Sequence, residues 1–170
     1  MRNAMVVAAW TLAASLQPVA AAGLPGPLVT PEWVSAHLGE VTVLDIREDP
    51  ESFTAEPVFE ADAKTGAKVL SEVGGHVPGA RLVDYADARV EREIGGHRIK
   101  GMLPDRVAFE ALMRAAGIGA GRPVVIASPG ATLEDLDTAA RLYWSLKFYG
   151  EDDVAILDGG TAGWLQAGLA

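Results

Sequence analysis

The chain contains no cysteine among its 170 residues. This absence excludes disulfide bonds, thiolate metal sites and any catalytic thiol supplied by the chain itself. Histidine is also scarce, and His37, His76 and His97 are scattered along the sequence. Because three scattered histidines do not have the spacing of a metal site, we expect neither a metal nor another cofactor.

The chain has no excess of basic residues. It carries 14 Lys and Arg against 23 Asp and Glu, a formal net charge of -9. An acidic surface repels phosphate backbones, so we expect no nucleic-acid partner. An anionic substrate would need a local positive site. The share of hydrophobic residues, 49%, is that of an ordinary globular domain.

No apolar run is as long as the roughly 20 residues of a membrane span. The longest, Met5–Leu16, follows the basic residue Arg2 and precedes Ala20–Ala22, which resembles a cleavage site. This pattern is typical of a secretory signal peptide. We therefore predict a signal peptide over residues 1–22, export to the periplasm, no membrane association after cleavage, and one mature domain over residues 23–170. An uncleaved anchor or a buried helix is the alternative.

Strand and helix patterns alternate along the mature chain. Strands are predicted at Val41–Arg47, Arg81–Asp84, Pro123–Ala127 and Val154–Leu157. Helices are predicted at Pro31–Leu38, from Pro104 to Gly117, at Thr138–Tyr149 and at Ala162–Ala167. This alternation predicts an α/β fold, with a mainly parallel central sheet covered by helices on both faces.

Two segments interrupt the alternation. Glu48–Gly74 is polar and irregular, and we predict a long loop there with a short helix near Val69–Glu72. Glu91–Gly101 is rich in glycine and charge and predicts a small hairpin.

Several motifs, in the right order, resemble those of the rhodanese family of thiosulfate and 3-mercaptopyruvate sulfurtransferases. They are the turn Gly75–Ala80, and the segment Asp158–Gly160 with Gly163 and Trp164 after a buried strand. The resemblance covers Leu28–Ala170 and implies a rhodanese-like three-layer fold. It also implies transfer of sulfane sulfur on a cysteine persulfide.

Where the resemblance places the catalytic cysteine, at the end of Pro123–Ala127, this chain has Ser128. A hydroxyl cannot form a persulfide, and no histidine lies nearby in sequence to activate it. The loop predicted over Ser128–Asp137 looks longer than the usual active loop and lacks its basic residue. Glu134, Asp135 and Asp137 put negative charge where a sulfur anion would bind, although carboxylates are also typical of helix starts. We therefore assign no catalytic residue.

Other motif residues have structural interpretations. The resemblance includes Asp45 and Arg47, which we interpret as a structural ion pair or as partners of the loop backbone. We interpret His76 as a turn histidine bonded to backbone rather than a catalytic base. Arg81 is a weak candidate for anion binding. Tyr143 and Trp144, with Phe148, indicate a second apolar surface on their helix.

The resemblance is strongest to the non-catalytic N-terminal half of tandem sulfurtransferases. The opening helix, the long insertion before the Gly-His turn and the segment Met102–Asp105 suit that type, and Gly168–Ala170 falls where such a domain runs into its linker. The expected partner is a catalytic rhodanese domain, in cis or in trans. The alternative is a free-standing exported pseudoenzyme acting as a binding module. A third hypothesis is a hydrolase with Ser128 as its nucleophile.

Overall fold

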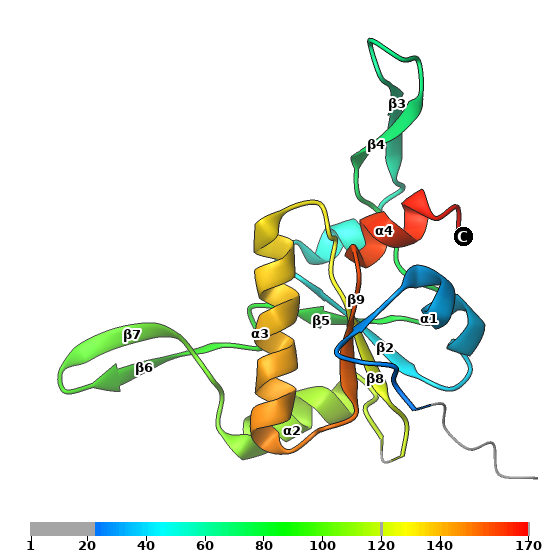
Figure 1. The fold of residues 1–170 in the computed structure, drawn as a ribbon. Coiled ribbons are helices and arrows are strands. Elements are labelled where there is room, and N and C mark those ends of the chain that lie inside the picture. Colours follow the sequence, from blue (N-terminus) through cyan, green and yellow to red (C-terminus); the bar gives the residue numbers. More distant parts are fainter. Residues whose placement is uncertain (1–22, 120, 170) are drawn as a thin grey trace, which may run out of the picture.

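The computed structural model describes residues 23–119 and 121–169 (Figure 1). The predicted signal peptide, residues 1–22, lies outside the described residues. In chain order the elements are β1 (Leu28–Val29), α1 (Pro31–His37), β2 (Thr42–Arg47), the 3-10 helix η1 (Pro50–Phe53), β3 (Val58–Ala61), β4 (Lys68–Glu72), β5 (Arg81–Asp84), β6 (Val90–Ile94), β7 (His97–Met102), α2 (Arg106–Ala115), β8 (Val124–Ala127), α3 (Leu133–Tyr149), β9 (Val154–Leu157) and α4 (Gly160–Gln166).

The centre of the fold is a five-stranded parallel sheet in the order β1-β9-β8-β2-β5. All four residues of β8 are buried, and so are most residues of β2 and β9. Strands covered on both faces become continuous apolar runs, which is why the sequence identified them. The two-residue strand β1 was not predicted, because only its pairing with β9 defines it.

Two apolar clusters lie on opposite faces of the sheet. Alternate strand residues such as Leu44 and Ile126 pack against α2 and α3. The intervening residues, such as Val43 and Val125, pack with Val34 of α1 and with Trp164 of α4. This arrangement confirms the predicted three-layer fold with helices on both faces.

Two helices begin earlier than predicted. The N-terminal residue of α3 is Leu133 rather than Thr138, because Thr132 and Asp135 form a capping box that satisfies the first free N–H groups. Helix α4 starts at Gly160, two residues before Ala162. Both errors came from assigning residues of the first helical turn to the preceding loop.

The short helix predicted near Val69–Glu72 was wrong, because this segment is strand β4, paired antiparallel with β3. Asp62 organises the intervening turn, accepting hydrogen bonds from the backbone N–H groups of Lys64 and Thr65. Lys68 lies over the Phe59 ring, 4.3 Å from its centroid. The strand pairing and the turn contacts together outweigh the local helix preference of a four-residue segment.

Two hairpin arms project from the domain, β3–β4 and β6–β7 (Figure 1). The second confirms the hairpin predicted within Glu91–Gly101. In the described part of the chain, no helix combines the length and the apolar character needed to cross a bilayer.

Candidate functional site

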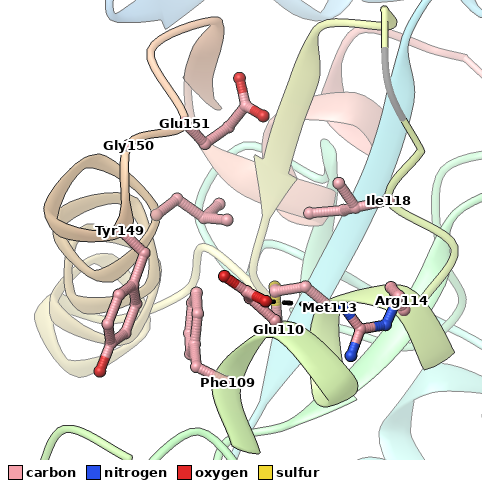
Figure 2. A pocket seen from close by; sticks show the side chains of 9 residues that line it. Phe109, Glu110, Met113, Arg114, Ile118, Tyr149, Gly150 and Glu151 are labelled. Carbon is pink, nitrogen blue, oxygen red and sulfur yellow. Dashed lines mark ion pairs between the residues drawn. The ribbon is translucent and has the colours of Figure 1, made fainter. Parts of the chain in front are cut away.

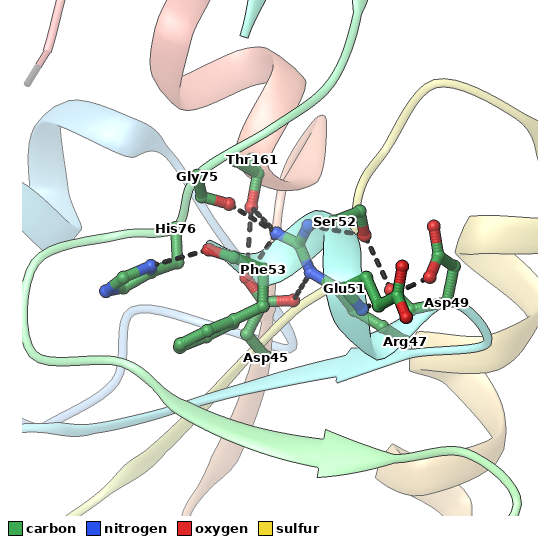
Figure 3. A network of polar contacts seen from close by, with 9 residues as sticks. All are labelled: Asp45, Arg47, Asp49, Glu51, Ser52, Phe53, Gly75, His76 and Thr161. Carbon is green, nitrogen blue, oxygen red and sulfur yellow. Dashed lines mark hydrogen bonds and ion pairs between the residues drawn. The ribbon is translucent and has the colours of Figure 1, made fainter. Parts of the chain in front are cut away.

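Three of the residues singled out by the sequence, together with Thr161, lie at the carboxyl ends of the parallel strands. Asp45 and Arg47 lie at the end of β2, Ser128 follows β8, and Thr161 lies in the first turn of α4. In open α/β sheets ligands collect at this edge. Figure 3 shows the polar network that occupies part of it.

A buried ion pair forms the centre of this network. Arg47 and Asp45 have side chains that are 0% exposed. Two parallel hydrogen bonds of 2.8 Å join them, from Nε to Oδ1 and from Nη2 to Oδ2. The bidentate geometry compensates for the desolvation of both charges. The interpretation of these residues as a structural ion pair is therefore confirmed.

The remaining donors of Arg47 connect separate segments of the chain. Nη1 donates to the hydroxyl of Ser52 at 2.9 Å, and Nη2 donates to the carbonyl oxygen of Gly75 at 2.6 Å. Nη2 also lies 3.3 Å from Oγ1 of Thr161, whose hydroxyl donates to Asp45 at 3.2 Å. Arg47 is thus committed to structure and is not free to bind a substrate.

His76 lies in the turn before β5, outside the buried pair. Its Nδ1 donates to the carbonyl oxygen of Phe53 at 2.9 Å. The two rings stack with centroids 3.9 Å apart. The interpretation of His76 as a turn histidine bonded to backbone is confirmed.

The loop after β8 is short and fixed against α4. Because α3 begins at Leu133, the loop comprises only residues 128–132, so the prediction of an unusually long loop was wrong. The carbonyl oxygen of Ser128 accepts a hydrogen bond of 2.8 Å from the N–H of Thr161. A Cβ on Gly130, whose φ is 77°, would lie 2.1 Å from the carbonyl oxygen of Gly159. The two segments are in backbone contact, which leaves the loop little room to move.

Asp135 occupies two of the backbone N–H groups that could hold an anion in this loop. Its Oδ2 accepts hydrogen bonds of 2.9 Å from the backbone N–H groups of Ala131 and Thr132. The N–H of Asp135 donates in return to the Thr132 hydroxyl at 3.2 Å. The prediction that these acids start a helix is confirmed for Asp135. The sequence did not reveal that its carboxylate fills the loop.

Ser128 is 4% exposed. Within residues 23–119 and 121–169, no hydrogen bond joins its hydroxyl to a histidine: His37 bonds to the carbonyl oxygen of Trp33, and His76 to that of Phe53. A serine nucleophile needs a base within hydrogen-bond reach. The geometry therefore gives the hydrolase hypothesis no support.

An acidic cavity of about 320 Å³ lies beside the start of α3. Glu48, Leu133, Glu134, Asp137 and Thr138 line it. Three carboxylates make this surface unfavourable for an anion unless a partner adds positive charge. In the described part of the chain, no group of three or more His, Asp or Glu residues is placed to hold a metal ion.

Two other cavities lie away from Ser128. One of about 210 Å³ separates the C-terminal end of α3 from α2 and is lined mainly by apolar residues such as Phe109, Met113 and Tyr149 (Figure 2). The other, also about 210 Å³, contains Arg81 and Arg122 and lies where β2 and β5 begin. Arg81 therefore lies at the amino ends of the parallel strands, whereas Ser128 lies at their carboxyl ends.

Comparison with known proteins agrees with the motifs and the fold. A probable 3-mercaptopyruvate sulfurtransferase of Pseudomonas aeruginosa is 35% identical in an alignment of 153 residues that covers 84% of this chain and 46% of the relative. The 3-mercaptopyruvate sulfurtransferase of Escherichia coli K12 is 27% identical over 81% of this chain and 43% of its own length. The chain therefore spans less than half the length of these relatives.

The structure resembles the crystal structure of SseA, a 3-mercaptopyruvate sulfotransferase from Escherichia coli. The TM-score is 0.57 at 23% identity, over 84% of this chain and 50% of SseA. Residues 30–167 match the rhodanese-like domain family. Because this match covers most of the chain, the chain belongs to the rhodanese-like domain family.

Proposed function

We propose that this chain is a non-catalytic rhodanese-like domain that supports a cysteine-bearing rhodanese-like domain in sulfur transfer. The catalytic domain would belong to the same polypeptide or to a separate subunit. The observation that carries the proposal is Ser128 in a cysteine-free chain, in a loop whose N–H groups bind Asp135.

The chemistry explains why the chain alone should be inactive. In sulfur transfer from thiosulfate, a thiolate attacks the sulfane sulfur, a new S–S bond forms, and the original S–S bond breaks with release of sulfite. The nucleophile must be a good sulfur nucleophile at neutral pH, which a thiolate is and a serine hydroxyl is not. The persulfide would also need free N–H groups around it, and Asp135 already binds those of Ala131 and Thr132.

The supporting role would be to form one wall of a substrate cleft between two domains. Pockets commonly lie at domain interfaces. The sulfurtransferase relatives are more than twice as long as their matched regions, which leaves room in each for a second domain. Thiosulfate and 3-mercaptopyruvate are the substrates to test first, because the relatives' names contain them. We also propose export to the periplasm with removal of residues 1–22.

Two measurements test this function. The intact mass of the natural protein should be roughly twice that of one domain, or the domain should purify with a cysteine-bearing rhodanese-like subunit. Thiosulfate:cyanide sulfur transfer by the 170-residue chain should equal a protein-free blank, and Ser128→Cys should restore little activity. Turnover by the unmodified chain would refute its assignment as non-catalytic.

The alternative function is a free-standing exported pseudoenzyme that binds partners. The observation that supports it is the apolar patch with Trp144, 49% exposed, and Phe148, 60% exposed, which suits both proposals. A natural protein whose mass matches residues 23–170, with no associated rhodanese-like subunit, would select this alternative.

A further inference from the structure

The cavity at the amino ends of the strands is positively charged, in a chain whose formal net charge is -9. It has a volume of about 210 Å³ and includes Arg81, the first residue of β5, and Arg122, which precedes β8. Among the described residues that line it, none is Asp or Glu. Positive charge on a concave surface raises the local concentration of anions. The cavity thus supplies the local positive site that an anion needs on this acidic chain.

Arg122 is held in place by the loop between α1 and β2. Its Nη2 donates to the carbonyl oxygens of Gly39 and Val41, at 2.5 and 3.0 Å. Its Nε donates to the carbonyl oxygen of Glu40 at 3.5 Å. Its Nη1 has no partner within residues 23–119 and 121–169. Because the loop backbone already orients this guanidinium, little side-chain freedom is lost when Nη1 binds a ligand.

Arg81 lies on the face of the sheet that α2 covers. Its register partner in β2 is Leu44, which belongs to the apolar cluster packed against α2. The guanidinium of Arg81 lies against Gly117, directly after that helix: a Cβ on Gly117 would be 2.2 Å from Nη1. The glycine therefore leaves the space that the guanidinium occupies.

The donors of Arg81 are not used by the fold. In the part of the chain that the structure describes, Arg81 makes no hydrogen bond and no ion pair. The C-terminal end of a helix attracts cations, but the carbonyl oxygens of Met113 and Arg114 at the end of α2 accept backbone N–H groups instead. The five N–H groups of this guanidinium are thus available to a ligand.

We propose that this cavity binds a small tetrahedral oxyanion, such as sulfate or phosphate, in contact with Arg81 and Arg122. The inference does not depend on the function proposed above. Parallel N–H groups of a guanidinium match two oxygens of such an anion. The anion would also offset the repulsion between two like charges in one cavity. A volume of about 210 Å³ is below the roughly 300–1,000 Å³ of sites for drug-sized ligands, which favours an inorganic anion over a nucleotide.

An NMR titration of the ¹⁵N-labelled 170-residue chain with sodium sulfate tests the proposal, with sodium chloride keeping the ionic strength constant. The reporters are the backbone N–H groups of Gly79 and Gly117, which line the cavity, and Nε of Arg81. Ala131, in the loop after β8, is the control position. We expect saturable shifts at the three reporters and no shift at Ala131.

Two variants identify the groups responsible. Arg81→Gln removes a guanidinium that makes no hydrogen bond in the described fold, and it should weaken sulfate binding about tenfold, because hydrogen bonds between charged groups are among the stronger ones. Arg98→Gln is the matched control. It removes one positive charge from the projecting β6–β7 arm, where the Arg98 side chain is 79% exposed, and it should leave the sulfate affinity unchanged because solvent and salt screen this charge.

Three results would overturn the proposal. Shifts that grow linearly with the sulfate concentration would indicate general screening rather than a site. Saturable shifts of equal affinity in Arg81→Gln would place the anion elsewhere. Saturable shifts at Ala131 in place of Gly117 would place it in the loop after β8 and would also contradict the contact between that loop and Asp135.

Discussion

Replacing Asp45 with asparagine should reveal how strongly the buried network stabilises the site. The substitution keeps the shape of the side chain and removes its charge. Arg47, 0% exposed, would then lose its only bidentate acceptor but keep its bonds to Ser52, Gly75 and Thr161. Breaking a buried ion pair typically costs about 3–5 kcal/mol. Because those acceptors remain, we expect the lower end, about 3 kcal/mol.

Urea unfolding followed by tryptophan fluorescence measures this loss. With a slope of about 2 kcal/mol per molar urea, a loss of about 3 kcal/mol lowers the midpoint by about 1.5 M. The double variant Asp45→Leu/Arg47→Met should lose less than Asp45→Asn, since it leaves no unpaired buried charge. Glu91→Gln is the control for an exposed pair and should cost less than about 1 kcal/mol. A loss below about 1 kcal/mol for Asp45→Asn, or a larger loss for the double variant, would contradict this reasoning.

Three further predictions concern the loop after β8 and the β3–β4 turn. Gly130→Ala should destabilise the chain by about 2–3 kcal/mol, because the new Cβ would collide with the backbone of Gly159. The control is Gly150→Ala, which is also at positive φ but in open space, and it should cost only about 1 kcal/mol in the same urea assay. Asp135→Ala should cost about 1 kcal/mol through loss of the capping box, and amide exchange at Ala131 should accelerate; an unchanged exchange rate there would argue against the carboxylate contact. The Thr65 hydroxyl and N–H hold the pKa of Asp62 below its usual value, so an NMR titration of this carboxyl should have a low midpoint, which should rise in Thr65→Ala. These hydrogen bonds stabilise the turn fully at a pH above the ordinary pKa of aspartate. The stabilisation is lost as the pH falls through the lowered pKa of Asp62.

The sequence predicted the elements whose signals are local or fully buried. Strand β8 was identified because burial on both faces makes it continuously apolar. Helix α1 was predicted to begin at Pro31, where proline suits the first helical position, and in the structure Thr30 is its N-cap. The segment 69–72 and the two-residue strand β1 depend on pairing with distant strands, which no local pattern specifies.

The candidate site was predictable only in part. Motif resemblance located Ser128, and it also included Asp45 and Arg47, which were interpreted as an ion pair or as partners of the loop backbone. The acids after Ser128 were correctly associated with a helix start, but that start was placed five residues too late. To recognise that the Asp135 carboxylate binds backbone N–H groups of the loop, one must know where the helix begins and where this side chain points. Neither can be obtained from the residue types alone.

The carboxylate of Asp135 has a consequence for any attempt to restore sulfur chemistry. It is tethered four residues from the Ala131 N–H that it binds, so it competes with dissolved anions as an intramolecular ligand. Groups joined by short linkers typically have effective concentrations in the millimolar range or above. A sulfur anion would have to displace this carboxylate to use the same N–H groups. Two N–H groups of the loop are thus already bound by a carboxylate of the same chain, and a thiol at position 128 would restore a nucleophile without freeing them.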